Sequence, residues 1–600
     1  MKRFQKAIAA GLAGMMLLTA CSGGGTSTGG STEAPQLSAL QFPDEYVNEE
    51  PAIEGGVLKV GVVAASPFQG MFNSQLYEDA VDGNIMQPTM LGQGMVDEDF
   101  KIREGGGLFY EVDKDTKTVK IKLHEKLTWN DGTPVTSKDI IYTYKFIGHP
   151  DYTGVRFDSG MRNVVGMEEY HDKKAEEISG LKVIDDKTVE VTFKTASPSM
   201  LWGGQGLPFN FLPAHQMENI PVKDMESSDA SRKTPLSYGP YYITNIIPGE
   251  KVEFAANEHF WNGKPKIPKI TMEVVSPDVV AEAMKIGKFD ILTGGFPTSN
   301  YDQIKDLNNI KILGSPERSY AYIGFKLGKW DITKNEVVTD PNAKMADPVL
   351  RKAMGHALDM KSLGEQLYFG LRGAADSYFV PVFKKLYNHH PNAILFDKDK
   401  AMKLLDDAGY KDVDGDGFRE KPDGSKLEIN VATMAGGDIG DNLALFYTQS
   451  WEAIGLNAKL TTGRPIEFNA FYDKVQADDP EIDVFMAAWS VGSNPDPNEF
   501  FARTAQFNFS RFASDELDQI LSDISSEKAF DDQFRLDAYK RFEDYMFEQV
   551  PMIPIQFRTS VIVVNNRVKN YDVKLPDSSR PYTGWGDLEL TAEEPYVHQG

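Results

Sequence analysis

The segment LTWNDGTPVTSKD, residues 127–139, combines a tight turn with the start of a helix. Its central residues 130–134 supply turn chemistry, because Gly132 is free to adopt a positive φ and the following proline fixes the exit of the chain. Thr136 lies three residues before Asp139, which is the spacing of a helix N-cap and its acidic N3 partner. The segment therefore predicts a strand end, a turn and a capped helix in succession.

Strand and helix patterns interleave along the rest of the chain. The apolar run 57–63 is rich in β-branched residues and predicts a buried strand, whereas residues 119–123 and 189–193 alternate at period two and predict half-buried strands. Apolar spacings of three and four predict helices over residues 349–357, 400–408, 441–454 and 516–524. This interleaving predicts an α/β or α+β fold.

Several segments together resemble one protein family. Residues 127–139, with Tyr142 and Tyr144, are similar to the signature of the family 5 extracellular solute-binding proteins, the oligopeptide-binding lipoproteins of ABC importers. Further matches follow in the order of that family: 239–241 (GPY), Gly249, 257–261 (NEHFW), 349–359 (VLRKAMGHALD), 401–410 (AMKLLDDAGY) and 481–497. The resemblance covers essentially the whole chain beyond its first residues.

The resemblance implies an α/β fold of the periplasmic-binding-protein type (type II, cluster C), with two hinged lobes and an extra subsidiary domain. A ligand that contacts both lobes makes more contacts when they are closed, so it shifts the population toward closure. Chain crossings are expected near 296–297 and 553–554. The implied parts are a signal peptide (1–20), a lipidated flexible tether (21–50), a first lobe (51–85, 195–297 and 556–600), its subsidiary domain (86–194) and a second lobe (298–555).

The first residues predict export. Three basic residues within 1–6 precede an apolar run at 7–19 that is too short to span a bilayer stably. The sequence LTAC at 18–21 resembles a bacterial lipobox, which implies that Cys21 is lipidated; the alternative is a signal peptide with an incidental cysteine. Residues 22–35 are rich in Gly, Ser and Thr and predict a flexible tether. We expect a protein anchored by lipid at the extracellular face of the cell membrane.

Composition excludes several classes of function. Lys and Arg total 63 against 88 Asp and Glu, and the net charge of -25 argues against nucleic acid as a partner. Cys21 is the only cysteine, so an intramolecular disulfide and a cysteine-based metal cluster are excluded. Motifs of zinc peptidases and nucleotide-binding enzymes are absent from the sequence. We expect no enzyme, with a peptidase as a minor alternative, and we expect His389 and His390 to be exposed bystanders.

The resemblance also implies where a peptide is bound. Family contact segments fall on Phe72, Asn73, Ser74 and Gln75 in the first lobe and on Ala488, Trp489 and Ser490 in the second. An extended peptide offers main-chain groups that strand edges and loops can satisfy without reading its sequence. For Phe72 and Trp489, packing in the core is the open alternative.

One position departs from the family. Several members place an aspartate three residues after the corresponding tryptophan, where it can pair with the terminal ammonium of the peptide. Gly492 stands there in this chain, and the next carboxylate, beyond Asn494, is Asp496 between two prolines. We therefore expect a site that reads mainly the peptide main chain, with an ammonium anchor only if Asp496 or another acid substitutes.

A second motif suggests calcium chemistry. Six residues occupy positions 1, 3, 5, 7, 9 and 12 of an EF-hand-like loop: Asp412, Asp414, Asp416, Phe418, Glu420 and Asp423. Aspartate replaces the usual glutamate at position 12, and residues 426–431 read as a strand, so the EF-hand is incomplete. A structural Ca²⁺ ion and a solvated acidic turn are both open. No cofactor is required.

The implied partners are oligopeptides, an ABC permease of two membrane subunits with two cytoplasmic ATPases, and the membrane through the lipid anchor. We expect a monomer. Relatives on the same scaffold bind dipeptides, nickel complexes, haem or signalling peptides, so pheromone sensing or another solute is the main alternative. A surface adhesin or chaperone is a minor one.

Overall fold

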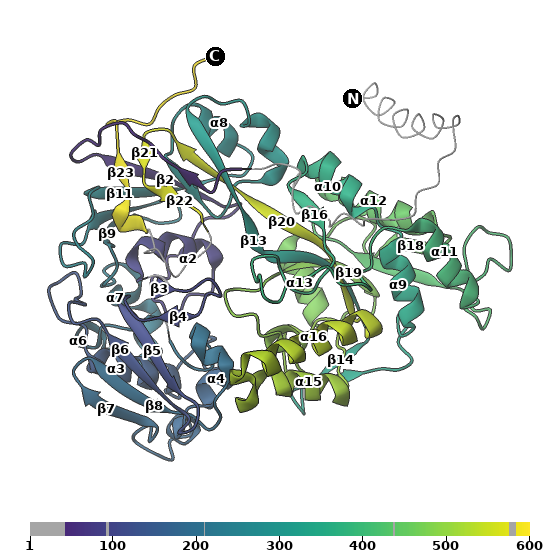
Figure 1. Cartoon of the computed structure of the whole chain (residues 1–600), viewed down its shortest axis with the longest axis horizontal. Coiled ribbons are helices and arrows are strands. Elements are labelled where there is room, and N and C mark those ends of the chain that lie inside the picture. The colour runs from purple at the N-terminus through teal and green to yellow at the C-terminus, as the bar shows by residue number, and fades with distance from the viewer. Residues whose placement is uncertain (1–41, 92–94, 209, 436–438, 575–583) are drawn as a thin grey trace. The chain divides into compact units, whose positions relative to one another are not determined.

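The computed structural model describes residues 42–91, 95–208, 210–435, 439–574 and 584–600. The described residues belong to one compact unit (Figure 1). The predicted signal peptide, Cys21 and the first part of the tether lie outside the described residues. Within the described ranges, no helix has the length and apolar character needed to cross a membrane.

An 11-stranded mixed sheet runs through the body. Its strand order, with β16 (Arg372–Ala374) paired to β20 beside the main path, is β18 (Asn457–Leu460), β17 (Glu428–Ala432), β19 (Val484–Ser490), β13 (Ile310–Phe325), β20 (Met552–Asn565), β12 (Ile291–Thr293), β2 (Val57–Val63), β11 (Lys269–Val275), β10 (Lys251–Ala256) and β9 (Tyr241–Ile247). Both parallel and antiparallel pairs occur. Strands and helices alternate along the chain, which confirms their predicted interleaving.

The smaller sheets surround this one. A four-stranded antiparallel sheet has the order β5 (Leu108–Asp113), β6 (Thr118–Leu123), β8 (Thr188–Thr192) and β7 (Leu181–Asp185). The two-stranded pairs are β1 (Glu45–Tyr46) with β22 (Tyr571–Asp572), β3 (Met95–Val96) with β4 (Ile102–Arg103), β14 (Gly328–Asp331) with β15 (Glu336–Thr339), and β21 (Val568–Lys569) with β23 (Glu589–Leu590).

The helices belong to the two lobes and to the part around the four-stranded sheet. Those in the first 300 residues are α2 (Ala80–Met86), α3 (Ser137–Gly148), α4 (Ser159–Arg162), α5 (Met167–His171), α6 (Ala214–Met217), α7 (Asp229–Arg232) and α8 (Val280–Lys285). Those that follow are α9 (Pro348–His356), α10 (Met360–Tyr368), α11 (Lys398–Asp407), α12 (Gly440–Glu452), α13 (Phe468–Gln476), α14 (Asn498–Phe501), α15 (Asp515–Ser525) and α16 (Asp532–Gln549). The 3-10 helices are η1 (Gln87–Thr89), η2 (Pro198–Trp202), η3 (Val222–Ser227), η4 (Thr298–Gln303), η6 (Glu527–Phe530) and η7 (Trp585–Asp587). The four helices predicted from apolar spacing are present as α9, α11, α12 and α15.

Separate hydrophobic cores define two lobes. One core packs around β2, β9 to β12 and the first half of β13, and we call this part the first lobe. A second core unites the last part of β13 with β17 to β19 and α9 to α16, and we call it the second lobe. The strands β13 and β20 run from one core into the other (Figure 1). The predicted crossing at 553–554 lies in β20, whereas the one at 296–297 precedes β13.

The subsidiary domain has its own core around the four-stranded sheet and α3. Thr136 and Asp139 form the predicted capping box at the start of α3. The predicted turn before it is also present, with Gly132 at φ 90°. Phe211 and Tyr238 also pack in this core, and the Tyr238 ring contacts the Trp129 ring. Hydrophobic packing therefore carries the subsidiary domain beyond the predicted range 86–194, whose exact limits stay a prediction.

Residues 42–50, the last part of the predicted tether, pack against the body. Residues 42–50 were expected to be flexible, but β1 pairs with β22 and the Tyr46 hydroxyl donates to the carbonyl of Asn566 at 3.1 Å. Phe42 packs edge-on against the ring of Tyr301. Residues 42–50 make these contacts because they offer aromatic and strand-forming side chains.

Candidate functional site

The junction between the lobes lies where β13 changes register on β20. Pro316 pairs with Thr559 and Tyr320 with Phe557, so residues 317–319 bulge out of the ladder. β19 joins β13 on the other side, where Ser490 pairs with Ser319. The predicted contact segment 488–490 is therefore held at the junction.

A cavity of about 380 Å³ opens on the first-lobe side of this junction. Its lining includes the glycine pair 294–295, Glu317, Ser560 and Trp585. Glu317 belongs to the bulge itself, and its carboxylate accepts a hydrogen bond from the Ser319 hydroxyl at 2.6 Å. The bulge therefore presents a carboxylate to a space large enough for part of a ligand.

Trp489 belongs to an aromatic cluster in the second lobe. Its side chain is 8% exposed, and it stacks on Tyr322 and Phe509 with ring centroids 5.0 Å and 5.2 Å away. The space between these rings and Phe500 is only about 10 Å³. This arrangement favours the core alternative for Trp489. Ala488 and Ser490, its neighbours along β19, point to the opposite face of the sheet.

Asp496 joins the two lobes. Its carboxylate accepts hydrogen bonds from the Ser199 hydroxyl of η2 at 2.8 Å and from the Ser525 hydroxyl at 3.1 Å. The backbone and side chain of Asn498 donate to the same carboxylate. A bond from Ser199 crosses between lobes, so Asp496 is already engaged by protein donors. Its role as an ammonium anchor stays a prediction.

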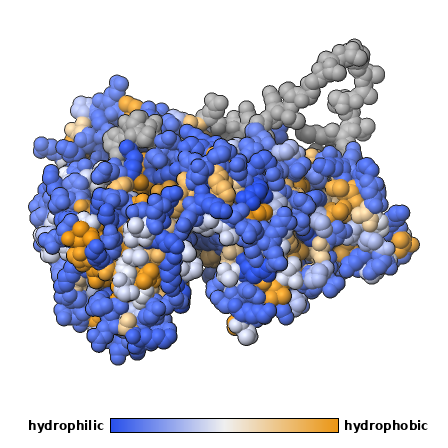
Figure 2. Space-filling model, turned by 60° about the horizontal axis from the view of Figure 1, so that its bottom comes forward, coloured by the Kyte–Doolittle hydropathy of each residue, from blue (hydrophilic) through white to orange (hydrophobic). Residues whose placement is uncertain are grey.

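Further contacts between the lobes surround this bond. Lys117 pairs with Glu527 at 3.1 Å, and the Arg535 guanidinium lies over the Trp202 ring at 5.9 Å. Burial raises the pKa of Glu499 in α14, and the nearby carboxylate of Asp158 from the first lobe raises it further. The space-filling view in Figure 2 shows a hollow near the centre of the molecule, with hydrophilic residues predominating around it. The lobes thus touch through polar groups and through aromatic side chains, since the Phe100 and Phe383 rings also meet edge-on.

Gly492 and Asn494 lie beside this interface. Gly492 has φ 58°, and no atom lies within 4 Å of where its Cβ would be. The Asn494 amide approaches Gly204 of the first lobe. Space therefore exists at the position where several relatives carry an aspartate.

The first-lobe segment 72–75 is mostly buried. Phe72, Asn73 and Gln75 are 4%, 1% and 3% exposed. Asn73 donates to the Ser231 hydroxyl at 3.1 Å, and Gln75 donates to the carbonyl of Asn210 at 2.7 Å. Together with Ser74, Phe72 and Asn73 line a small cavity of about 40 Å³. The structure does not bring this segment and 488–490 into contact in any described bond, and peptide contact at both stays a prediction.

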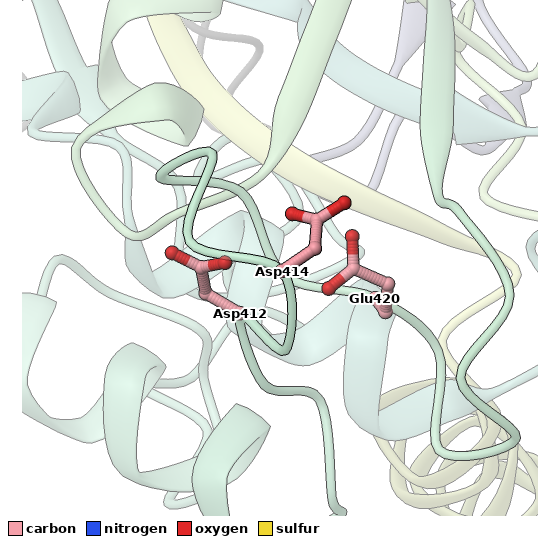
Figure 3. Close-up of side chains that lie close together, drawn as sticks. All are labelled: Asp412, Asp414 and Glu420. Atoms are coloured by element: carbon pink, nitrogen blue, oxygen red, sulfur yellow. The ribbon is translucent and has the colours of Figure 1, made fainter.

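Part of the predicted calcium loop forms a carboxylate cluster. Oxygens of Asp412, Asp414 and Glu420 lie within 4.8 Å of one another (Figure 3). The Lys426 ammonium also lies here, paired with Asp414 and with Glu420 at 2.9 Å. The predicted strand after the loop is present as β17.

The other predicted ligands are not among the three carboxylates that converge. Asp416 pairs with Lys426 and accepts from the backbone of Phe418. Asp423 accepts from the backbone and hydroxyl of Ser425. In the structure the cation beside these carboxylates is the Lys426 ammonium. Calcium binding by the loop therefore stays a prediction.

Comparison with known proteins identifies the family. Residues 105–509 match the model of the bacterial extracellular solute-binding proteins, family 5 Middle. The oligopeptide-binding protein OppA of Lactococcus lactis subsp. cremoris (strain SK11) is 32% identical over 561 residues, which span 92% of this chain and 93% of OppA. The oligopeptide-binding protein AppA of Bacillus subtilis (strain 168) is 25% identical over 520 residues, which span 83% of this chain and 87% of AppA.

Solved structures agree with this result. Lactococcal OppA, complexed with an endogenous peptide in the closed conformation, superposes with a TM-score of 0.79 at 30% identity and covers 89% of this chain and 100% of its own. AppA from Bacillus subtilis in complex with a nonapeptide gives a TM-score of 0.70 at 20% identity and supports the fold alone. The predicted two-lobed α/β fold is confirmed. This chain belongs to the bacterial extracellular solute-binding proteins of family 5.

Proposed function

We propose that this chain captures extracellular oligopeptides between its two lobes and delivers them to an ABC importer. The observation that carries the proposal is the similarity to OppA along nearly the full length of both chains, at 32% identity. The superposition on the peptide-bound, closed form of lactococcal OppA supports it further. Binding without catalysis accounts for both observations.

The two strands that link the lobes suggest how capture works. A peptide lying along the junction can pair its main-chain groups with strand ends and loops of both lobes. The hydrogen bond from Ser199 to Asp496 joins the two lobes directly. In the closed state such direct contacts stabilise the protein in addition to the contacts that the peptide makes with each lobe. The free energy of both sets of contacts then favours closure around a bound peptide.

Delivery follows from the predicted anchor. A lipid on Cys21 and the Gly/Ser-rich tether would hold the body near the membrane and raise its effective concentration at the permease. That permease would comprise two membrane subunits and two ATPases. The bound protein is proposed to act as a monomer at the extracellular face of the membrane.

Native mass spectrometry of the purified protein tests the proposal. Denaturation of the complex should release a heterogeneous set of intact oligopeptides, and peptide addition should compact the protein in solution scattering. A single peptide species would instead favour pheromone sensing. Release of a nickel complex or haem, or of cleaved peptide fragments, would contradict oligopeptide capture.

A further inference from the structure

Two arginines face each other at the junction of the lobes. Arg372 of β16 pairs directly with Arg558 of β20 in antiparallel register. Side chains that are directly opposite on neighbouring strands lie close together, and like charges in that position destabilise the sheet. This arrangement opposes folding unless another interaction compensates for it.

In the described part of the chain, neither guanidinium forms an ion pair with a carboxylate at contact distance. The Nε atoms of Arg372 and Arg558 are both buried and lack a hydrogen-bond acceptor. The Arg372 guanidinium lies 3.6 Å from the centroid of the Tyr368 ring, and burial lowers the pKa of Arg372 to about 10. Both side chains are half-buried. Arginine carries five N–H donors in a planar fork, so this pair presents strong donors to any anion that reaches it. The chain carries 88 acidic residues, so a shortage of carboxylates does not explain the unpaired state.

The pair lies beside the predicted peptide contacts. Arg558 faces the bulge at 317–319, where β13 loses register on β20. Burial raises the pKa of Tyr472, and both the charge of Arg558 and the backbone N–H of Ala488 partly oppose this rise. Arg558 is therefore an electrostatic neighbour of the 488–490 segment. The charge of Glu317, which lines the cavity of about 380 Å³, reaches Arg372.

We propose that Arg372 and Arg558 bind a carboxylate group of the captured peptide. This inference rests on the proposed function and assigns a chemical preference to the same site. Guanidinium groups recognise carboxylates through paired, charge-assisted hydrogen bonds, and a bound carboxylate removes the repulsion between the two cations. The carboxylate is either the C-terminus of the peptide or an Asp or Glu side chain. The peptide would then be held by its carboxylate at the arginines and not by its terminal ammonium at an aspartate, since Gly492 stands at the position of that aspartate.

Two matched peptide pairs test the inference in the purified full-length chain, stripped of co-purified ligand. The first pair lacks Asp and Glu and differs only in a free or an amidated C-terminus. The second pair is amidated and differs in one internal Glu or Gln. At least one carboxylate-bearing peptide should bind about tenfold or more tightly than its neutral partner, and the pair that differs identifies the source of the carboxylate.

Substitutions locate the effect. Arg372→Gln and Arg558→Gln should abolish the preference for the carboxylate form, whereas Arg541→Gln, which breaks a surface pair with Asp523, should retain it. Equal affinity for both members of both pairs overturns the inference but leaves peptide capture intact, and this comparison needs no variant. Preference that persists in both arginine variants also overturns it. Failure of all four peptides to bind refutes the proposed function and the inference together.

Discussion

The Ser199 hydroxyl donates a 2.8 Å hydrogen bond to the Asp496 carboxylate, and this bond joins the first lobe to the second. The two residues are separated by 297 positions in the sequence. The same carboxylate accepts from Ser525 within the second lobe. One acid therefore couples the lobe interface to the packing of α15.

Ser199→Ala should weaken the ligand-bound, closed state without unfolding the protein. Loss of one hydrogen bond to a charged group costs about 1.5 kcal/mol, which corresponds to about a tenfold loss of peptide affinity. Calorimetric titration with an oligopeptide measures this change. Ser525→Ala is the matched control, because it removes a bond to Asp496 inside one lobe and should leave affinity nearly unchanged. Equal losses in the two variants would contradict a role for the bond in closure.

Local patterns predicted features that depend on short stretches of the backbone. The capping box of Thr136 and Asp139 needs only residues three positions apart, and the structure contains it. Asp412, Asp414 and Glu420 also converge as their spacing predicts. In each case the chemistry depends on backbone geometry over a few residues, which sequence spacing records.

Contacts that depend on strand register could not be predicted in the same way. Arg372 meets Arg558 because β16 pairs with β20 in one particular register, and no local pattern specifies that register. His390 was expected to be exposed, but it is buried against the Phe547 ring and bonded to Asp544. Its surroundings come from α16, more than a hundred residues away in the chain. Tertiary packing thus decides these positions.

Arg567→Met should strongly destabilise the first lobe. Arg567 and Asp290 are fully buried, and the guanidinium donates to both carboxylate oxygens, the longer bond being 2.7 Å. Removal of the cation leaves Asp290 buried without its counter-charge, which costs about 3–5 kcal/mol. Urea denaturation measures the loss in the free energy of unfolding. The double variant Asp290→Leu/Arg567→Met should lose less than the sum of the two single variants, and additive losses would show that the pair is not coupled.

The protein should lose stability as the pH falls below about 6.5, in part through His356. His356 is 4% exposed and contacts the Leu395 carbonyl through Nδ1, and burial lowers its pKa below the usual 6.5. The unfolded chain then binds a proton that the folded chain resists, so the free energy of unfolding rises with pH in this window. His356→Asn keeps a donor near Nδ1 and should flatten this slope between about pH 5 and 7. The exposed His259→Asn variant should leave the slope unchanged, and an unchanged slope in His356→Asn would exclude His356 as the source.

Lys426→Gln should destabilise the acidic loop and reveal whether the loop takes calcium. The Lys426 ammonium pairs with Asp414, Asp416 and Glu420, and these contacts raise the pKa of the lysine. Glu420 is 2% exposed, so loss of this partner destabilises its carboxylate more than the carboxylates of the exposed aspartates.

The melting temperature of the chelated protein should fall in the variant, and Ca²⁺ should restore it by replacing the lost cation with a divalent one that prefers carboxylate oxygens. The exposed Lys403→Gln variant, which breaks an ion pair with Asp407 in α11, is the control and should gain no comparable response. If Ca²⁺ shifts the melting temperature of neither the wild type nor the Lys426→Gln variant, the loop is a solvated acidic turn held by the lysine. In the variant the carboxylates have lost the one cation that the described structure pairs with them, so their failure to bind Ca²⁺ would contradict a calcium site.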